Sequence, residues 1–168
     1  MTKLKKFGGK YKDETVDRIA RYFGFSAGLH FGSDVPDEDR IKAAKKTLKE
    51  WTHGHDELFV ILEDKETAGF VHINYRTDNT AWIEDIYVDE LKRGKGIATR
   101  VIALSEDKIK AHRGYTSICL DASPDNKAAL AFYHKLGYVT LGMITVSKEL
   151  KKSDRKNEIE LLGLTYKY

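Results

Sequence analysis

The stretch from Ala81 to Leu120 constrains the fold more than any other part of this sequence, because its pattern changes twice. Ala81 to Val88 is a strand-like apolar run, Ile97 to Lys110 has apolar residues at helical spacing, and Thr116 to Leu120 is strand-like again. A strand, a helix and a second strand in this order form a right-handed parallel crossover. The sequence therefore predicts a parallel strand pair inside the sheet, at the kind of junction where mixed sheets bind ligands.

Shorter patterns give the elements on either side. A helix is predicted from Asp13, followed by a loop from Phe25 to Val35, and a second helix starts after Pro36 and ends at His53–His55. The other predicted elements are strands at 58–62 and 68–75, a helix capped by Ser123 and ended by Gly137, and strands at 139–146 and 158–166. Lys3 to Phe7 is too short and too basic to assign. These elements predict an α/β (α+β) fold, with flanking helices around a central mixed, mostly antiparallel sheet.

Composition limits the function classes. The chain has 168 residues, which suits a single domain spanning 1–168. Its net charge of +3 over 33% charged residues is nearly balanced, so we expect no nucleic-acid partner. The basic N-terminus lacks the apolar stretch of a signal peptide, and no apolar run is long enough to span a membrane. The sequence has a single cysteine, Cys119, which fits a reducing compartment. We therefore expect a cytoplasmic domain with no membrane partner.

A turn with two glycines, Arg93-Gly94-Lys95-Gly96, joins the strand at Val88 to the helix at Ile97. Glycines let the backbone approach a ligand closely, and the first amides of a helix have no acceptor within the helix. Such a turn can bind an anion, with the helix dipole and the two basic side chains nearby. An ordinary strand-to-helix turn explains the same residues equally well. Neither the Walker loop nor the dinucleotide fingerprint fits the spacing.

The turn also resembles motif A of the GNAT acetyltransferase superfamily, whose signature is Arg or Gln, two residues, Gly, one residue, and then Gly or Ala. Arg93, Gly96 and Ala98 stand at these positions. A later segment resembles the family helix that reads Asn…Ala…Phe-Tyr…Leu-Gly-Phe. Its matching residues are Asn126, Ala129, Phe132, Tyr133, Leu136 and Gly137, with Tyr138 in place of the usual Phe. The resemblance covers residues 58–140 well, and it implies the GNAT fold, in which the parallel strand pair is splayed.

The resemblance implies that acetyl-CoA is the co-substrate that donates the acyl group. In the family, the pyrophosphate lies on the amides after the motif's Arg, and the pantetheine arm lies between the splayed strands, hydrogen-bonded to the backbone. The residues that this implies as cofactor-binding are Ile86, Tyr87, Val88, Arg93, Gly94, Lys95, Gly96, Ile97, Ala98, Thr99 and Asn126. Dimers are common in the family, so a homodimer is one expectation.

Glu84 and Asp85 interrupt an otherwise apolar strand, one on each face if the strand is regular. Because burying an unpaired carboxylate is costly, either a bulge turns both to solvent, a Lys or Arg pairs with them, or they serve the reaction. An alkyl ammonium must lose a proton before it attacks an acyl group, so we expect Glu84 to be the general base and Asp85 a substrate contact. Glu-Asp-Ile-Tyr-Val also resembles this stretch in GNAT enzymes that act on polyamines and aminoglycosides, where the Glu is a proposed base.

The resemblance makes Tyr133 the acid that protonates the departing thiolate, although a place in the core stripe of its helix is the alternative. We expect His72 and Asp34 to line the acceptor site with Asp85, at the first two helices and their loop. Ordinary polarity of a half-exposed strand explains His72 equally well. His53-Gly54-His55-Asp56 has no further ligands at metal-site spacing, so an exposed turn and no metal are expected there.

The sequence thus predicts an acetyl-CoA-dependent N-acetyltransferase, an acyltransferase that moves acetyl directly to a primary amine. The expected acceptor is a small cationic molecule such as a polyamine or an aminoglycoside. Two alternatives stay open. A protein or peptide amino-group acetyltransferase needs an open groove for its substrate. A non-catalytic basic binding module on the same fold has no affinity for CoA and binds nucleic acid in a salt-dependent way.

Overall fold

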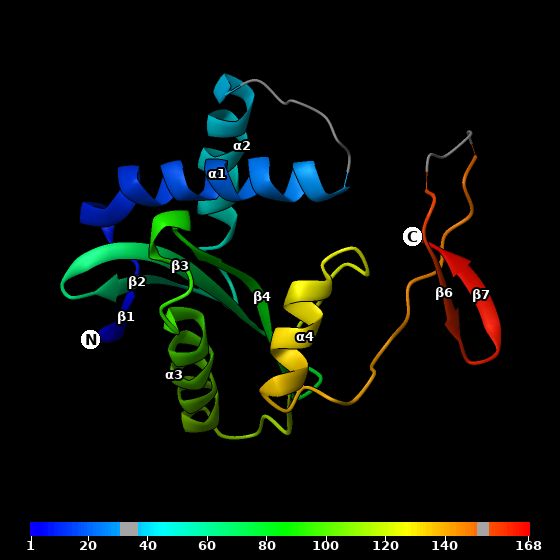
Figure 1. The fold of residues 1–168 in the computed structure, drawn as a ribbon. Helices are drawn as coiled ribbons and strands as arrows, with labels where there is room; N and C mark the ends of the chain where they lie inside the picture. Colours follow the sequence, from blue (N-terminus) through cyan, green and yellow to red (C-terminus); the bar gives the residue numbers. More distant parts are fainter. Residues whose placement is uncertain (31–36, 151–154) are drawn as a thin grey trace. The chain divides into compact units, whose positions relative to one another are not determined.

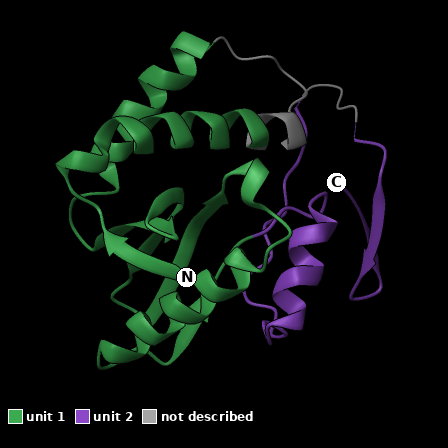
Figure 2. Ribbon diagram, turned by 60° about the vertical axis from the view of Figure 1, so that its left-hand side comes forward, with its two compact units in different colours: residues 1–121 green, residues 122–168 purple. Residues whose placement is uncertain are grey.

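A computed structural model describes residues 1–30, 37–150 and 155–168, with the side chains of 26–30 left aside. The chain divides into two compact units, Met1–Asp121 and Ala122–Tyr168 (Figure 2). The expectation of a single domain stays a prediction. Within the described residues, no helix has the length and apolarity that crossing a membrane requires.

A five-stranded sheet forms the centre of the first unit (Figure 1). Its strands, in spatial order, are β1 (Thr2–Lys6), β2 (Asp56–Glu63), β3 (Glu66–Tyr75), β4 (Thr80–Val88) and β5 (Ser117–Cys119). Neighbours are antiparallel except β4 and β5, which are parallel, so the predicted mixed sheet is confirmed. Sequence reasoning did not assign β1, because lysines dominate this edge strand, which hydrogen-bonds only to β2.

Helices cover both faces of this sheet. α1 (Lys12–His30) and α2 (Asp37–Glu50) lie on one face and α3 (Ile97–Ala111) on the other (Figure 1). Short 3-10 turns, η1 (Gly9–Tyr11) and η2 (Glu90–Lys92), precede α1 and follow β4. On the α1 and α2 face, the predicted apolar stripes form a buried cluster. Its members are Val16, Ile19, Ala20, Ala44, Leu48, Leu58, Phe70 and Tyr87.

The loop predicted from Phe25 to Val35 is wrong in its first part, because α1 continues to His30. Gly24 in α1 lies against α2: a Cβ there would lie 3.1 Å from Nη1 of Arg40. Glycine at this position thus serves the contact between two helices. The remainder of the predicted loop, residues 31–35, lies outside the described residues.

The second unit contains α4 (Lys127–Lys135) and a hairpin of β6 (Glu158–Leu161) and β7 (Leu164–Lys167). Asn126, not Ser123, caps α4, since its side-chain oxygen accepts the Ala129 N–H at 3.1 Å. The stop predicted at Gly137 is confirmed, because the Gly137 and Tyr138 amides bond back into the last turn.

Both strands predicted near the C-terminus need correction. The strand at 139–146 is wrong: in the described part of the second unit nothing pairs with this segment, and an alternating pattern forms a strand only with a neighbour. The strand at 158–166 is a hairpin instead, because Leu162 and Gly163 both adopt positive φ, at 53° and 77°. Two such residues form the tight turn that matches hairpin twist, and Leu-Gly is an uncommon sequence for it.

Candidate active site

A β-bulge in β4 places the two candidate carboxylates on one face of the sheet. His72 pairs with Asp85 and Ile73 with Ile83, so Glu84 is the extra residue of β4. Asp85 contacts His72, and Glu84 contacts Arg76. Asn74, two residues from His72, pairs with Trp82, and Glu84 is two residues from Trp82, so Glu84 lies on the face of the sheet that carries His72. The strand is therefore not regular, and the condition for one carboxylate on each face is not met. Two of the alternatives left open by the sequence, a bulge and an arginine partner, are present here.

Glu84 is held by an arginine that is itself stacked on a tryptophan. Nη2 of Arg76 lies 2.9 Å from Oε1 of Glu84, and the Arg76 guanidinium lies 3.8 Å from the ring centroid of Trp82. The Trp82 indole N–H donates to the hydroxyl of Thr80 at 3.1 Å. The Glu84 side chain is 28% exposed and that of Arg76 is 39% exposed. A base at Glu84 would thus start as a solvent-accessible, ion-paired carboxylate.

Asp85 belongs to a more buried cluster. His72 lies between two carboxylates, with Nδ1 at 2.9 Å from Asp85 and Nε2 at 2.8 Å from Asp56. The side-chain amide of Asn74 donates to the same Asp56 oxygen at 2.7 Å, and Trp51 stacks on the His72 ring with centroids 4.5 Å apart. His72 itself is 4% exposed. It therefore faces an acceptor only through Asp85.

The parallel strands separate after a short paired region. β4 and β5 pair only from Thr80 to Trp82, so the rest of β4 has no strand on that side among the described residues. The Asp89 amide donates to the Ala68 carbonyl of β3. Because successive residues of a strand alternate their backbone direction, Val88 and Ile86 turn their N–H and C=O groups to the open edge, whereas Tyr87 faces β3. The N–H groups of Ile86 and Val88 thus face an open edge, whereas the Val88 carbonyl accepts from Arg93.

The turn that follows β4 presents a row of amides. Gly94 and Gly96 have φ of 76° and 71°, and Gly96 is the N-cap of α3. Only glycine adopts this left-handed conformation without strain, so the two glycines are required by the turn itself. Within the described residues, the amides from Gly94 to Thr99 donate to no backbone carbonyl or side chain, and Ile97, Ala98 and Thr99 form the first helical turn. This arrangement fits an anionic ligand.

The basic side chains of the turn differ in direction. Nε of Arg93 donates to the Val88 carbonyl at 2.9 Å, and its guanidinium lies 5.0 Å from the ring centroid of Phe25 and 5.6 Å from that of Tyr87. Arg93 therefore stabilises the end of β4. Lys95 contributes its carbonyl to Nη1 of Arg100, while its side chain is exposed.

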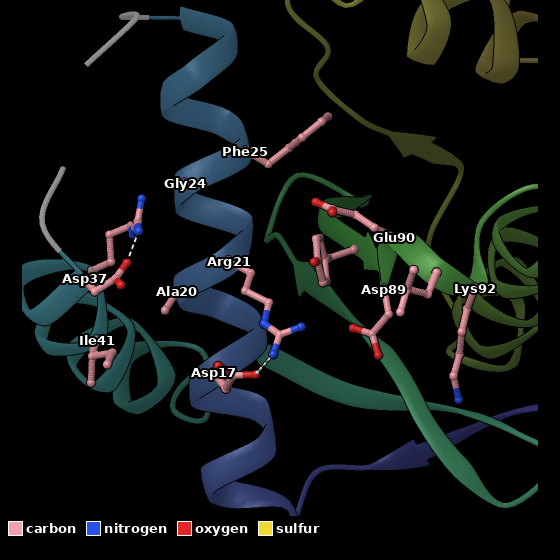
Figure 3. Close-up of a pocket in the computed structure, with 13 residues that line it drawn as sticks. Asp17, Ala20, Arg21, Gly24, Phe25, Asp37, Ile41, Asp89, Glu90 and Lys92 are labelled. Atoms are coloured by element: carbon pink, nitrogen blue, oxygen red, sulfur yellow. Dashed lines mark hydrogen bonds and ion pairs between the residues drawn. The ribbon is translucent and has the colours of Figure 1, made fainter. Parts of the chain in front are cut away.

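A cavity of about 830 Å³ lies between α1, the start of α2 and the end of β4 (Figure 3). Phe25, Ile41 and Tyr87 supply apolar surface, and burial raises the pKa of the Tyr87 hydroxyl. Four carboxylates also line it, and three of them are ion-paired, as Asp17–Arg21, Asp37–Arg40 and Asp89–Arg18. The fourth, Glu90, has no ion pair among the described residues. The lining is therefore acidic but largely neutralised.

The remaining candidates lie elsewhere. Asn126 and Tyr133 belong to the second unit, at the cap and in the body of α4. Burial raises the pKa of the Tyr133 hydroxyl, and its ring contacts Phe132 and Tyr138. Asp34 lies outside the described residues.

Sequence reasoning missed the partners of the two carboxylates. Arg76 continues the face that carries His72, so extending that alternation by one step would have found it. Asp56 was expected in an exposed turn, yet it begins β2 and reaches His72. No local signal points to Asp56, because its partner lies across a strand pair. The described residues contain no group of three or more His, Cys, Asp or Glu side chains arranged to hold a metal ion.

A model of the acetyltransferase (GNAT) family matches residues 22–138. N-alpha-acetyltransferase 30 of Schizosaccharomyces pombe is 33% identical over 84 residues, which cover 48% of this chain and 55% of that protein. An acetyltransferase of Pectobacterium atrosepticum is 43% identical over 99 residues, which cover 57% of this chain and 68% of that protein. The chain thus spans only about half of the first relative and about two thirds of the second.

A solved structure supports the same fold. The ribosomal-protein-alanine N-acetyltransferase from Brucella melitensis matches with a TM-score of 0.65 and 19% identity, over 89% of this chain and 100% of that chain. The family model covers more than half of the sequence, and the sheet carries the expected parallel pair. The chain therefore belongs to the acetyltransferase (GNAT) family, whose enzymes transfer acetyl groups from acetyl-CoA to amines.

Proposed function

We propose that this chain is an N-acetyltransferase that binds acetyl-CoA and a primary amine together and transfers the acetyl group directly. The observation that carries the proposal is the junction at the end of β4. There, an edge with open amides at Ile86 and Val88 is followed at once by the free amides of Gly94 to Thr99. A ligand with a narrow, amide-containing arm and a pyrophosphate at one end would use the strand edge for the arm and the amides of the turn for the pyrophosphate.

Acetyl-CoA supplies a thioester whose acyl carbon accepts an amine. The amides of Gly94 to Thr99 would hold its pyrophosphate, and Ile86 and Val88 would hold its pantetheine arm. An amide of the same β4 edge would donate to the acyl oxygen as negative charge develops there. Asn126 remains a proposed contact, although its side-chain oxygen already caps α4.

Glu84 is the proposed base. The bound ammonium first gives one proton to the Glu84 carboxylate, directly or through a water. The free amine nitrogen then forms the new C–N bond and releases its second proton to water as the amide forms. Tyr133 is the proposed acid, which gives its proton to the sulfur as the C–S bond breaks. Burial raises the pKa of its hydroxyl, so the phenol is protonated at neutral pH, as an acid must be, although it gives up that proton less readily.

The proposed acceptor is a small cationic amine. The cavity between α1, α2 and β4 combines four carboxylates with aromatic rings that suit the distal ammonium of a diamine. Glu84 and Asp85 do not line this cavity, so the reacting amine would lie outside it. However, only Glu90 is without an ion pair among the described residues, so we do not expect affinity for a polycation to be high.

A peptide α-amino group is the second candidate, and the observation that favours it is the 33% identity to a yeast N-alpha-acetyltransferase. An α-amino group has a pKa of about 8, so it loses its proton more easily than an alkyl amine. The cytoplasmic location and the homodimer stay predictions from the sequence.

A screen for released CoA thiol tests the function, with spermidine, kanamycin, free amino acids and short peptides as acceptors. We expect turnover with at least one primary amine, and the fastest acceptor decides between the two classes. Saturating acetyl-CoA should also raise the melting temperature by about 5 °C or more. No thermal shift and no turnover, together with salt-dependent binding to nucleic acid, would instead support the non-catalytic module.

A further inference from the structure

The two carboxylates of the β4 bulge are held in the same way by different partners. In each case one oxygen lies within hydrogen-bond distance of a nitrogen of a side chain that is stacked on a tryptophan: Arg76 on Trp82 for Glu84, and His72 on Trp51 for Asp85. The second oxygen of each carboxylate accepts no hydrogen bond within the described residues. Two free carboxylate oxygens on one face can serve one ammonium group, which has three N–H donors.

His72 is fixed on both edges and on one face. Carboxylates only accept hydrogen bonds, so the imidazole satisfies both Asp56 and Asp85 when it carries a proton on each nitrogen. Asn74 holds Asp56 in turn, and Trp51 covers the ring. His72 in this state has no free nitrogen to accept a proton. It can influence the reaction only through Asp85.

We propose that His72 is a positioning residue for acetyl transfer. Anchored by Asp56, it holds Oδ2 of Asp85 and leaves Oδ1 for the acceptor ammonium, beside the carboxylate of Glu84 that takes the proton. The inference rests on the proposed function, because it assigns Asp85 and His72 to the acceptor side of the same site. It also separates two roles that the sequence alone could not: Asp85 touches the amine, and His72 determines where Asp85 lies.

Kinetics of His72→Gln and Asp85→Asn test the proposal, with the fastest amine of the screen above as acceptor. We expect each variant to raise the KM of the amine about 30-fold, to change kcat by less than about three-fold and to leave the KM of acetyl-CoA within about two-fold. The double variant should be no worse than the worse single variant, since both remove one interaction. His55→Ala, which removes an exposed histidine from the turn before β2, is the control.

Proton NMR of the imidazole gives a readout that does not require turnover. In 15N-labelled protein at neutral pH, we expect two ring N–H resonances that disappear in His72→Gln, and Asp85→Asn should shift only one of them. Three results would each overturn the proposal. They are an equal rise in the KM of the amine and of acetyl-CoA, an unchanged KM of the amine in folded His72→Gln, and a single ring N–H resonance in the wild-type protein. If wild-type protein transfers acetyl to no amine, the proposed function fails, and with it the role of this cluster in transfer, whereas the NMR result still decides whether the cluster exists.

Discussion

Glu84 and Asp85 are consecutive residues on one face of the sheet, yet their surroundings differ in depth. Glu84 and its partner Arg76 are both partly exposed, whereas the partner of Asp85, His72, is buried beneath Trp51. An exposed ion pair contributes little to stability, and its members can change partners at small cost. A buried cluster is costly to break, because its removal leaves charges without compensation.

This difference suggests a division of labour. A general base must exchange its partner for a proton in every turnover, which suits the exposed pair. A group that orients the substrate must stay in place, which suits the buried cluster. The bulge makes the comparison meaningful, since a regular strand would have turned the two carboxylates to opposite faces.

The largest effect is expected for Glu84→Gln. The variant keeps the shape of the side chain but loses the base, so kcat at pH 7 should fall about 1,000-fold. Below the pKa of the amine, the remaining rate should rise about ten-fold per pH unit, because the free amine then becomes more abundant. Rates of thiol release from pH 6 to pH 9 measure this. Glu160→Gln, which changes an exposed glutamate of β6, is the control. If Glu84→Gln keeps full activity, another residue must be the base.

The second effect is on stability and separates the two clusters. His72→Leu leaves Asp56 and Asp85 without their shared partner, so the free energy of unfolding should fall by about 3 kcal/mol. Arg76→Leu breaks the exposed pair and should cost less than about 1 kcal/mol. Urea unfolding followed by tryptophan fluorescence gives both values. If the two variants lose the same free energy of unfolding, burial does not distinguish the two clusters.

Arg76→Gln should have a smaller effect on the reaction. Glu84 keeps its negative charge but loses the group that orients it, so we expect kcat to fall about ten-fold with the KM of acetyl-CoA unchanged. Arg113→Gln, which removes an exposed arginine after α3, is the matched control. A loss as large as that of Glu84→Gln would mean that Arg76 itself contacts the reacting groups.

The smallest change in kcat is expected for Tyr133→Phe. This variant removes the proposed proton donor and leaves the proposed base, Glu84, in place. Because burial raises the pKa of Tyr133 above its ordinary value, the wild-type phenol keeps its proton across the pH range of the assay. We therefore expect kcat of the variant to be about five-fold lower at every pH from 7 to 9. A wild-type kcat that falls between pH 7 and 9, with Tyr133→Phe free of this fall, contradicts the assignment.

Much of the fold could be predicted from the sequence, because the elements that position the site carry local signals. The glycines at 94 and 96 and the apolar stripe of α3 mark the strand, turn and helix that hold the proposed donor site. The bulge could not be predicted, since Glu84 differs from its neighbours only in how β3 and β4 pair. The strand expected at 139–146 was wrong for the same kind of reason: alternation shows that a segment can pair, but not that a partner is present.

The most direct test of the division of labour is a side-by-side measurement of kcat and the acceptor KM for Glu84→Gln and Asp85→Asn. Asp107→Asn on α3, an exposed aspartate, controls for the loss of a negative charge. The account predicts that Glu84→Gln lowers kcat with little change in the KM of the amine, and that Asp85→Asn raises this KM with little change in kcat. If both variants change the same parameter to the same extent, the two carboxylates do the same work, and the account is wrong.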